Sequence, residues 1–445
     1  MNDQENPAVM HRGLVVVGAI LIQLCLGAIY AWSVFTDRLT DADGPYGFSA
    51  GETMWIFSAG LATFAVVMVL AGRMMPRTGP RALAVGGGLV LGLGYVLGGF
   101  FGNSFLAQFI CIGLIGGAGI GLGYVVPIAV GVKWFPDKKG MVSGLAVAGF
   151  GFGATLWVKL AGSWFGGLLN TVELFGLPGV QSVFIIYGIV FAVLVLLGSI
   201  VMINPPEGYR PVGYTPPEVD KADSAAKLVD YTAGQMLRTP QYYGLLLMFV
   251  GSALAGLMVI GCIKLFGIDA LQASGAVTEE AAAGRAAGTA MALYAILNGL
   301  GRIAWGSVSD KIGVRLSLFL MCALQGVIML LFYTIGGTVA GLIIGACIIG
   351  FNFGGNFALF PVATADFFGS KHLGGNYGWV FLAYGIAGIA GPQVAGYFKD
   401  TAAGDVGAWV APFVIAGVAC LAAAALAAAV RKPKAPAMAE ADPAV

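Results

Sequence analysis

Charged residues are scarce in this sequence. Only 10% of its 445 residues are Asp, Glu, Lys or Arg, whereas 58% are hydrophobic, and the mean hydropathy is +0.88. Soluble domains usually carry about 25% charged residues, and a soluble fold would have too little polar surface to cover so much apolar material. The net charge of +1 offers no electrostatic basis for binding nucleic acid. A lipid bilayer is therefore the solvent that fits this composition.

Cysteine and histidine are too few and too dispersed for redox or metal chemistry. The six cysteines lie far apart within apolar runs, and no CxxC or Cys/His cluster occurs. The two histidines, His11 and His372, lie outside the apolar segments, which argues against a buried histidine base. The sequence also lacks a Gly-Lys-Ser/Thr phosphate loop that would support ATP use. We therefore expect no cofactor, no metal and no enzymatic activity.

Twelve apolar stretches are each long enough to cross a bilayer, which needs roughly 20 residues per helix. The longest polar stretch, 204–239, is rich in Pro, Glu, Asp and Lys and lies between the sixth and seventh. We predict an all-α integral membrane fold of twelve transmembrane helices in two six-helix bundles, residues 1–203 and 240–445, joined by a cytoplasmic linker, residues 204–239. The predicted spans are 13–35, 54–72, 82–101, 105–130, 141–168, 182–203, 241–267, 286–308, 316–336, 338–360, 376–398 and 409–430.

The distribution of basic residues indicates the orientation of the chain, because short cytoplasmic loops carry the excess of Lys and Arg. Odd-numbered connections hold few basic residues and many acids. We therefore expect a multi-pass protein of the inner (plasma) membrane with both termini in the cytoplasm. The basic residues of the even-numbered connections and the tail are Arg73, Arg77, Arg81, Lys133, Lys138, Lys139, Lys311, Arg315, Lys371, Arg431, Lys432 and Lys434.

One motif occurs at the same place in each half. GRMMPRTGPR, residues 72–81, follows the second span, and GSVSDKIGVR, residues 306–315, follows the eighth. Glycines at these spacings permit a tight turn and close helix contact, and basic residues complement the carbonyls at helix ends. The alternative to a shared motif is a pair of unrelated loops that are basic only because short cytoplasmic loops carry an excess of Lys and Arg. Pro76 replaces the acid in the first copy. The motif residues are Gly72, Arg77, Gly79, Arg81, Gly306, Asp310, Lys311, Gly313 and Arg315.

Three cations and no acids lie within or near the predicted spans: Lys159, Lys264 and Arg302. An ionisable group at the centre of a bilayer costs at least a few kcal/mol and is a functional candidate. A buried guanidinium without a carboxylate needs another counter-charge, and a transported anion is the simplest supplier. Arg302 suits a carboxylate because its planar fork binds one bidentately, and it shares a helix face with Tyr294 and Asn298. A structural role, bonded to backbone carbonyls, is the alternative.

The remaining site candidates are weaker. Lys159 follows Lys139 by about 30 Å of helix at ~1.5 Å per residue, which places it near the outer mouth, where a lysine can snorkel into water. Lys264 is expected to be an interface anchor. Tyrosine and asparagine side chains can donate to a carboxylate, although ordinary helix–helix hydrogen bonding is the alternative for each. The candidate substrate-binding residues are Arg302, Asn298, Tyr124, Tyr30, Tyr384, Asn352, Asn356 and Lys159.

Several segments resemble known families. KWFPDKKGMVSGLAVAG (133–149) resembles the signature of the monocarboxylate transporters. The repeated motif is similar to the loop motif of the major facilitator superfamily. Three other segments resemble the oxalate/formate antiporter family of prokaryotes, which belongs to the same wider group. They are GAIYAWSVF (27–35), GQMLRTPQYY (234–243) and ADFFGSKHLGGNYG (365–378).

The resemblance implies a two-bundle fold, alternating access, and an arginine of span eight, here Arg302, that binds the substrate carboxylate. Tyr124 matches a site tyrosine in span four. Oxalate carriers pair the arginine with a lysine in span eleven, where this chain has Tyr384, and one cation fewer favours a monoanion. Animal-type monocarboxylate carriers have a lysine in span one and an Asp one turn before the arginine, where this chain has Tyr30 and Asn298.

The expected function is therefore secondary active transport of a small monocarboxylate such as lactate or pyruvate. We expect coupling to a proton and action as a monomer. Anion exchange of the oxalate/formate type is the main alternative, and a sensor or channel of transporter shape is a further one. The expected partners are the small carboxylate, a proton and the lipid bilayer.

Overall fold

The computed structural model describes residues 10–41, 43–162, 164–177, 179–211, 230–401 and 406–433. Within these ranges the chain is helical and forms no β-strand beyond one isolated bridge. Length and hydropathy alone qualify ten of the described helices as membrane spans. Two more helices, α12 (Glu280–Ile312) and α15 (Leu373–Thr401), are also long enough to cross a bilayer. They bring the number of spans in the described chain to twelve. The predicted all-α, twelve-helix membrane fold is confirmed.

The first six spans precede the central polar stretch. Two short elements, η3 (Trp164–Gly166) and α8 (Leu168–Thr171), connect the fifth to the sixth. The spans are α1 (Gly13–Leu26) continued by η1 (Gly27–Ala31) and α2 (Trp32–Leu39), α3 (Ala50–Thr78), α4 (Pro80–Phe101), α5 (Phe105–Gln108) continued by η2 (Phe109–Gly116) and α6 (Gly117–Trp134), α7 (Lys139–Gly162), and α9 (Gly179–Ser199).

The last six spans follow the short helix α10 (Ala233–Met236). Residues 212–229 of the predicted linker and Lys434 lie outside the described residues, so the domain boundaries stay a prediction. The spans are α11 (Pro240–Ala273), α12, α13 (Val314–Ile335), α14 (Val339–Phe368), α15, and η4 (Val406–Trp409) continued by α16 (Val410–Ala429).

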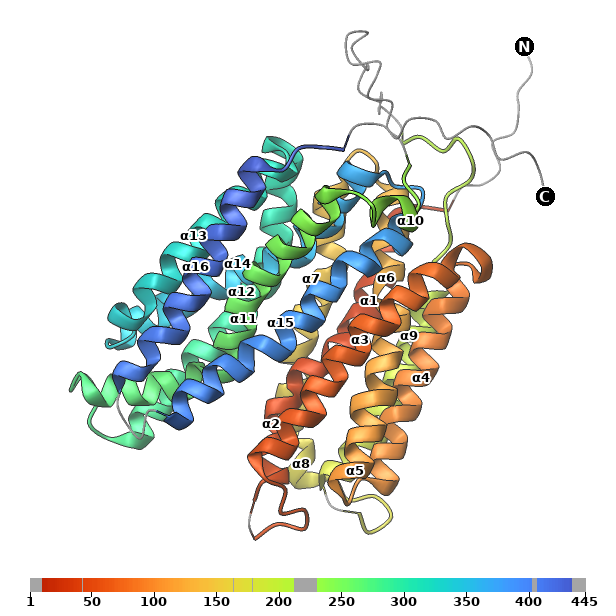
Figure 1. Cartoon of the computed structure of the whole chain (residues 1–445). Coiled ribbons are helices and arrows are strands. Elements are labelled where there is room, and N and C mark those ends of the chain that lie inside the picture. Colours follow the sequence, from red (N-terminus) through yellow and green to blue (C-terminus); the bar gives the residue numbers. More distant parts are fainter. Residues whose placement is uncertain are drawn as a thin grey trace, which may run out of the picture.

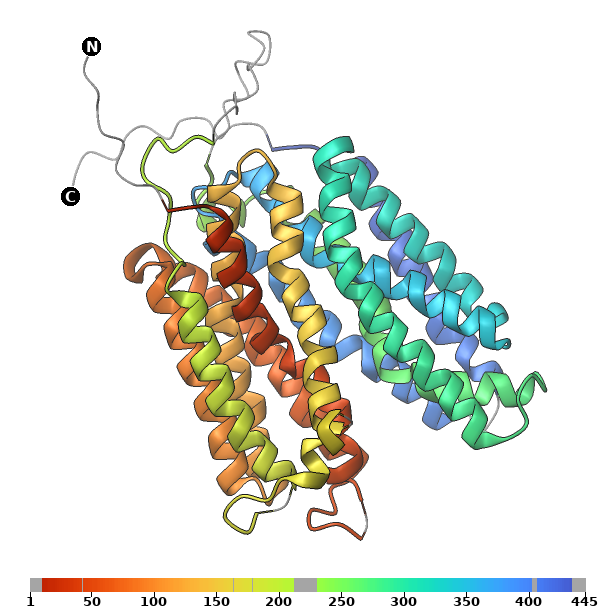
Figure 2. The same ribbon diagram turned by 180° about the vertical axis from the view of Figure 1, so that it is seen from behind.

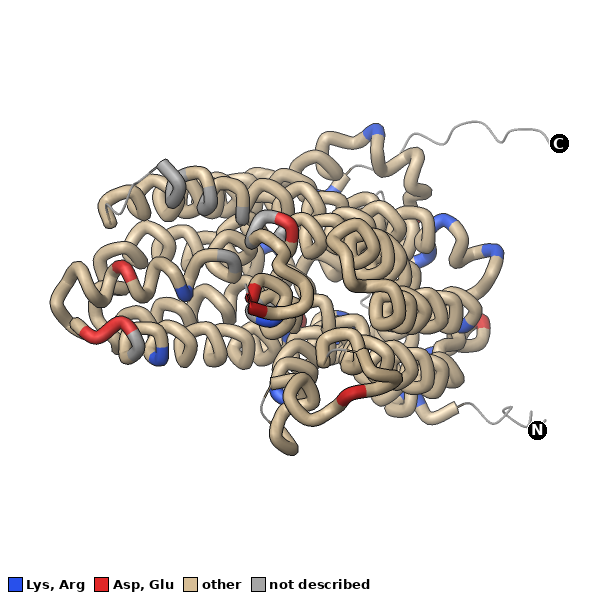
Figure 3. The backbone as a smooth tube through the Cα atoms, turned by 90° about the horizontal axis from the view of Figure 1, so that it is seen from below, with Lys and Arg blue, Asp and Glu red and all other residues tan. Residues whose placement is uncertain are grey.

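The two sets of helices form two groups that lie side by side (Figures 1 and 2). Across the boundary α7 packs against α12, and α3 packs against α15. The groups meet closely at the end where the described parts nearest both termini lie, and they diverge toward the opposite end (Figure 1). We call these the terminal end and the far end. Charged positions are few along the whole backbone (Figure 3).

The limits of several predicted spans differ from those of the helices. The predicted fifth span, 141–168, ends early because α7 stops at Gly162, and Gly166 and Gly167 then adopt positive φ angles of 85° and 77°. Such backbone angles suit glycine and break a helix. The seventh and eighth spans are longer than predicted, because α11 and α12 run for 34 and 33 residues. Their polar ends continue as helix beyond the apolar stretch.

The outer surface of the bundle suits contact with lipid tails. The helix α13 buries one face, including Met321 and Cys322, and exposes large apolar side chains on the other. A contiguous apolar surface of this kind marks contact with a membrane or a partner, and the composition favours the membrane. The exposed apolar residues of α13 are Leu316, Leu320, Leu324, Val327, Leu330 and Leu331.

Candidate functional site

Arg302 lies on α12 at the boundary between the two helix groups, and its side chain is 0% exposed. It is the one charged residue among the described chain that is classed as buried. Its Nε donates to Asn298 Oδ1 at 3.1 Å, one turn earlier on α12, and its Nη1 donates to the backbone carbonyl of Val147 on α7 at 2.8 Å. The guanidinium therefore bridges the two groups of helices.

Glycines bring α7 close enough for this bridge. A methyl group added at Gly144 would lie 2.3 Å from the Arg302 carbonyl oxygen, and one added at Gly151 would lie 3.1 Å from Gly299 Cα. Both glycines flank Val147 on α7, so the backbones of α7 and α12 are in near contact on either side of it. The glycine-rich segment 144–154 thus forms part of the contact between the two groups.

Aromatic rings surround the guanidinium. Its Cζ lies 4.1 Å from the ring centroid of Phe357 on α14 and 5.5 Å from that of Phe150 on α7. Cation–π contacts of this kind stabilise a desolvated cation but leave its net charge in place. Phe150 also contacts the Tyr124 ring at 5.4 Å, and Phe357 contacts the Tyr384 ring at 5.4 Å. The predicted tyrosines therefore lie in the same aromatic shell as Arg302.

Two hydrogen-bond donors in this shell have no partner among the described residues. They are Arg302 Nη2 and the Tyr124 hydroxyl, both buried. Leaving a buried donor unpaired costs about 1–3 kcal/mol, and more for a charged group. The Arg302 guanidinium acts electrostatically on the hydroxyls of Tyr124 and Tyr30, which lie near it without meeting hydrogen-bond geometry. The shell thus offers an unneutralised cation and a free hydroxyl to a small anion.

The side chains of Tyr30 and Tyr384 join the two helix groups next to this shell. The Tyr30 hydroxyl, from η1, is hydrogen-bonded to the Tyr384 hydroxyl, from α15. Tyr384 is 0% exposed, whereas Tyr30 lines an open cavity. The hydroxyl pair therefore lies between the open cavity and the buried aromatic shell.

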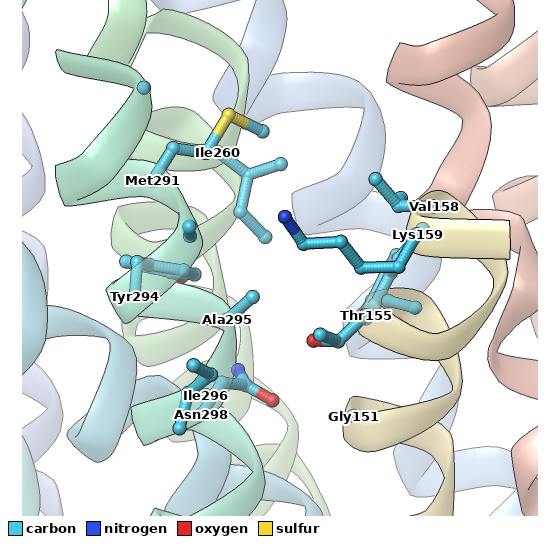
Figure 4. Close-up of a pocket in the computed structure, with 14 residues that line it drawn as sticks. Gly151, Thr155, Val158, Lys159, Ile260, Met291, Tyr294, Ala295, Ile296 and Asn298 are labelled. Carbon is cyan, nitrogen blue, oxygen red and sulfur yellow. The ribbon is translucent and has the colours of Figure 1, made fainter. Parts of the chain in front are cut away.

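The cavity has a volume of about 270 Å³ and lies between α7, α11 and α12 (Figure 4). Asn298 lines it and Arg302 does not, so the guanidinium is covered. Lys159 extends from α7 across the cavity (Figure 4). The lining continues from Asn298 toward Met291, which is the direction of the far end along α12. The cavity therefore extends from the covered arginine toward the far end, where the helix groups diverge.

Asn352 and Asn356, the two predicted asparagines of α14, are both buried and bonded within the second helix group. Asn352 Oδ1 accepts from the Trp305 indole at 3.2 Å, and Asn356 Nδ2 donates to the Phe353 carbonyl at 3.1 Å. Each keeps one polar atom without a partner among the described residues. Helix–helix hydrogen bonding, the alternative weighed from the sequence, accounts for the contacts of Asn352.

The second copy of the loop motif connects the helix groups at the terminal end. Asp310 accepts from the backbone N–H groups of Gly140 and Met141, both at 2.8 Å, through its two carboxylate oxygens. These N–H groups belong to the first turn of α7, where a carboxylate is favoured by the helix dipole. The backbone of Gly306 also approaches α7 closely, since a Cβ on Gly306 would lie 2.2 Å from the Gly140 carbonyl oxygen.

The remaining motif residues are nearly equivalent in the two halves. Gly79 and Gly313 end α3 and α12 with φ angles of 79° and 84°. Arg81 donates to the Ile200 carbonyl just after α9, and Arg315 Nε donates to the Ala427 carbonyl in α16 at 3.1 Å. Each arginine thus ties its loop to the sixth span of its own half. This equivalence supports the motif over two unrelated basic loops.

The first copy lacks the carboxylate contact. Pro76 stands in its place, and closure there depends on backbone proximity: a Cβ on Gly72 would lie 2.2 Å from the Gly374 carbonyl oxygen of α15. Arg73 lies over the Trp379 ring at 4.9 Å. Arg77 and Lys311 make no hydrogen bond or ion pair with described residues.

Sequence reasoning missed three components of the site. Phe150 and Phe357, which flank the guanidinium, look like ordinary apolar residues in apolar spans. The Val147 carbonyl belongs to the backbone and leaves no signal in the sequence. The position of Phe150 inside the glycine-rich segment was the one usable indication that it approaches another helix.

A twelve-helix membrane fold with a cavity between two helix groups, closed at one end, defines a transporter. Comparison with known families agrees: the model of the Major Facilitator Superfamily matches residues 13–284 and 276–444. The chain belongs to the major facilitator superfamily, and it is a multi-pass membrane transporter rather than an enzyme.

Curated relatives and solved structures extend the comparison. The chain is 31% identical to the uncharacterized MFS-type transporter YhjX of Escherichia coli, over 85% of this chain and 86% of that protein. It is 27% identical to the oxalate:formate antiporter of Oxalobacter formigenes, covering 85% and 82%, and 26% identical to apicoplast pyruvate carrier 1 of Toxoplasma gondii, covering 83% and 80%. The structure of the proton:xylose symporter XylE shares the fold, with a TM-score of 0.65, 16% identity and coverage of 93% and 94%.

Proposed function

We propose that this protein is a secondary active transporter of a small monocarboxylate anion, lactate- or pyruvate-like, that works by alternating access and is coupled to a proton. The observation that carries the proposal is the fully buried Arg302 with one unpaired terminal nitrogen. Neither described salt bridge involves it, and no described Asp or Glu is buried. An anionic substrate supplies the missing counter-charge.

The relatives support a small carboxylate. Their names include an oxalate:formate antiporter, a pyruvate carrier and monocarboxylate transporters. A single buried cation matches a single negative charge, since a second uncompensated carboxylate in the aromatic shell would have to be desolvated without a partner. Lactate and pyruvate meet this condition.

In the proposed complex, Arg302 Nη2 and the Tyr124 hydroxyl donate to the substrate carboxylate. Hydrogen bonds to a charged group contribute about 1.5–3 kcal/mol each, and the aromatic shell strengthens them by excluding water. The Tyr30–Tyr384 hydroxyl pair has to separate before an anion from the cavity can reach Arg302. The shell then encloses the apolar part of the substrate.

Alternating access follows from the two ends of the molecule. Under the positive-inside rule the terminal end is cytoplasmic, so the structure corresponds to a state closed to the cytoplasm and open to the outside. Asp310 and the glycine contacts hold the cytoplasmic end closed. Substrate binding neutralises Arg302 and lets the two groups rock to the opposite state.

No buried carboxylate is available among the described spans to carry a proton. We therefore propose that the proton travels on or beside the substrate. Exchange of two anions is the second candidate, and the 27% identity to the oxalate:formate antiporter favours it. Exchange predicts that internal anion stimulates uptake without dependence on a pH gradient.

The test is uptake of labelled lactate into proteoliposomes, with and without an inward proton gradient. We expect the gradient to stimulate uptake, and pyruvate to compete more strongly than oxalate. Arg302→Gln should lower kcat/KM by about 10- to 100-fold, the loss of the charge-assisted bond from Nη2. Arg302→Lys should restore little, because a lysine lacks the planar guanidinium that reaches Asn298, the Val147 carbonyl and the substrate at once. Lys264→Gln removes a charge from the exposed surface of α11 and is the matched control. Normal uptake by folded Arg302→Gln would contradict the proposal.

A further inference from the structure

The open cavity contains a charge that binding at Arg302 does not use. Lys159 is the one charged residue among those lining the cavity, whose walls are otherwise largely apolar, with Ile260, Met291 and Ile296. Its side chain extends from α7 with the ammonium directed toward α11 and α12 (Figure 4). Lys159 is exposed, and its ammonium reaches into the cavity.

Lys159 has no partner in the described part of the protein. Neither described salt bridge includes it, and no described side chain or carbonyl accepts a hydrogen bond from its ammonium. A cleft with one sign of charge and walls of low dielectric constant concentrates ions of the opposite sign. The cavity therefore attracts anions before they reach the covered arginine.

The helix α7 leads from this lysine to the central site. Thr155 and Gly151 precede Lys159 by four and eight residues and share its helix face, and both line the cavity; Val147 lies one turn further along α7. The Thr155 hydroxyl lines the cavity and has no hydrogen-bond partner among the described residues. The Val147 carbonyl is the group that holds Arg302. At ~1.5 Å per residue, Lys159 lies about 18 Å along α7 from that contact.

We infer that Lys159 forms a second, outer anion-binding site, which holds the carboxylate of the substrate at the entrance before its transfer to Arg302. The inference rests on the proposed anion transport. A lysine is suited to this step because its ammonium is a compact, hydrated point charge without a planar fork. It holds a carboxylate loosely and releases it readily, with the Thr155 hydroxyl as the next donor on the way inward.

The direct test is protection of Lys159 from an amine-reactive reagent, measured by mass spectrometry on the full-length protein. The experiment uses Arg302→Gln, so that binding at the central site cannot contribute. We expect lactate to slow the labelling of Lys159, and lactamide, a neutral analogue of similar shape, to leave it unchanged. Lys264 is exposed and outside the cavity lining, so its labelling is the internal control. Equal labelling of Lys159 with and without lactate would overturn the inference.

Transport kinetics give an independent readout. At low ionic strength Lys159→Gln should lower kcat/KM for lactate by about three- to ten-fold, and the difference should vanish in high salt because screening removes the attraction. Lys159→Arg should retain the salt-dependent attraction because it keeps the charge, and Lys264→Gln should behave as wild type. A wild-type kcat/KM for Lys159→Gln at low salt would refute the outer site while leaving the role of Arg302 intact. An unchanged kcat/KM for lactate in folded Arg302→Gln would instead refute the proposed function.

Discussion

Replacing Asp310 with Asn should weaken closure of the terminal end. Both Asp310 oxygens accept from α7 backbone N–H groups at 2.8 Å, and an amide retains one of these two acceptors. Hydrogen bonds to a charged acceptor contribute about 1.5–3 kcal/mol, and the interaction with the helix N-terminus contributes about 0.3–1 kcal/mol more. Asp310 is exposed, so solvent screening favours the lower values. A loss of about 1.5–2 kcal/mol changes the equilibrium between the two states by about 10- to 30-fold.

The assay measures how often the cavity is open. Ala292 lines the cavity and is exposed, so Ala292→Cys reports opening through its labelling by a membrane-impermeant maleimide. Five of the six native cysteines are buried, and Cys347 is replaced by Ser to remove background. If the open state is favoured about ten to one, Asp310→Asn leaves roughly a quarter to a half of the molecules open. Labelling should then be about two- to four-fold slower.

Asp366→Asn is the matched control, because Asp366 pairs with Lys432 at 2.8 Å on the exposed surface of the same helix group. An exposed pair of this kind contributes about 0–1 kcal/mol, and the Asp366 contact does not cross between the groups. Its labelling rate should equal that of the parent. An unchanged labelling rate in folded Asp310→Asn would refute the view that this carboxylate holds the terminal end closed.

Three further substitutions separate closure, substrate binding and stability. Gly306→Val should abolish lactate uptake while the protein is still inserted, because a Cβ there would lie 2.2 Å from the Gly140 carbonyl oxygen; normal uptake would show that the helices need not approach so closely. Tyr124→Phe should raise KM for lactate about ten-fold with little change in Tm, since the hydroxyl has no described partner; a fall in Tm without a change in KM would assign the hydroxyl a structural role. Asn352→Ala should lower Tm, because the Trp305 indole loses its acceptor at a cost of about 1–3 kcal/mol, and should leave KM unchanged; the reverse pattern would place Asn352 in the substrate site.

The sequence alone determined the membrane class, the twelve helices, the repeated motif and the unpaired cation. Each of these follows from local composition, because an apolar run of sufficient length is stable in lipid only as a helix. A charge inside such a run is conspicuous without any knowledge of its neighbours. Arg302 therefore stood out as a candidate, and the structure places it at the boundary between the helix groups with one nitrogen unpaired.

Only the tertiary structure decided what surrounds that cation. Helical periodicity places Asn298 one turn from Arg302, but it cannot show that the Val147 carbonyl and the Phe357 ring meet the same guanidinium. It also could not show that Asp310 reaches the first turn of α7. Contacts between distant helices depend on how closely and at what angle their backbones approach, and glycines such as Gly144 set that approach only when the facing helix is known. Periodicity fixes the faces of one helix, whereas packing selects which faces meet.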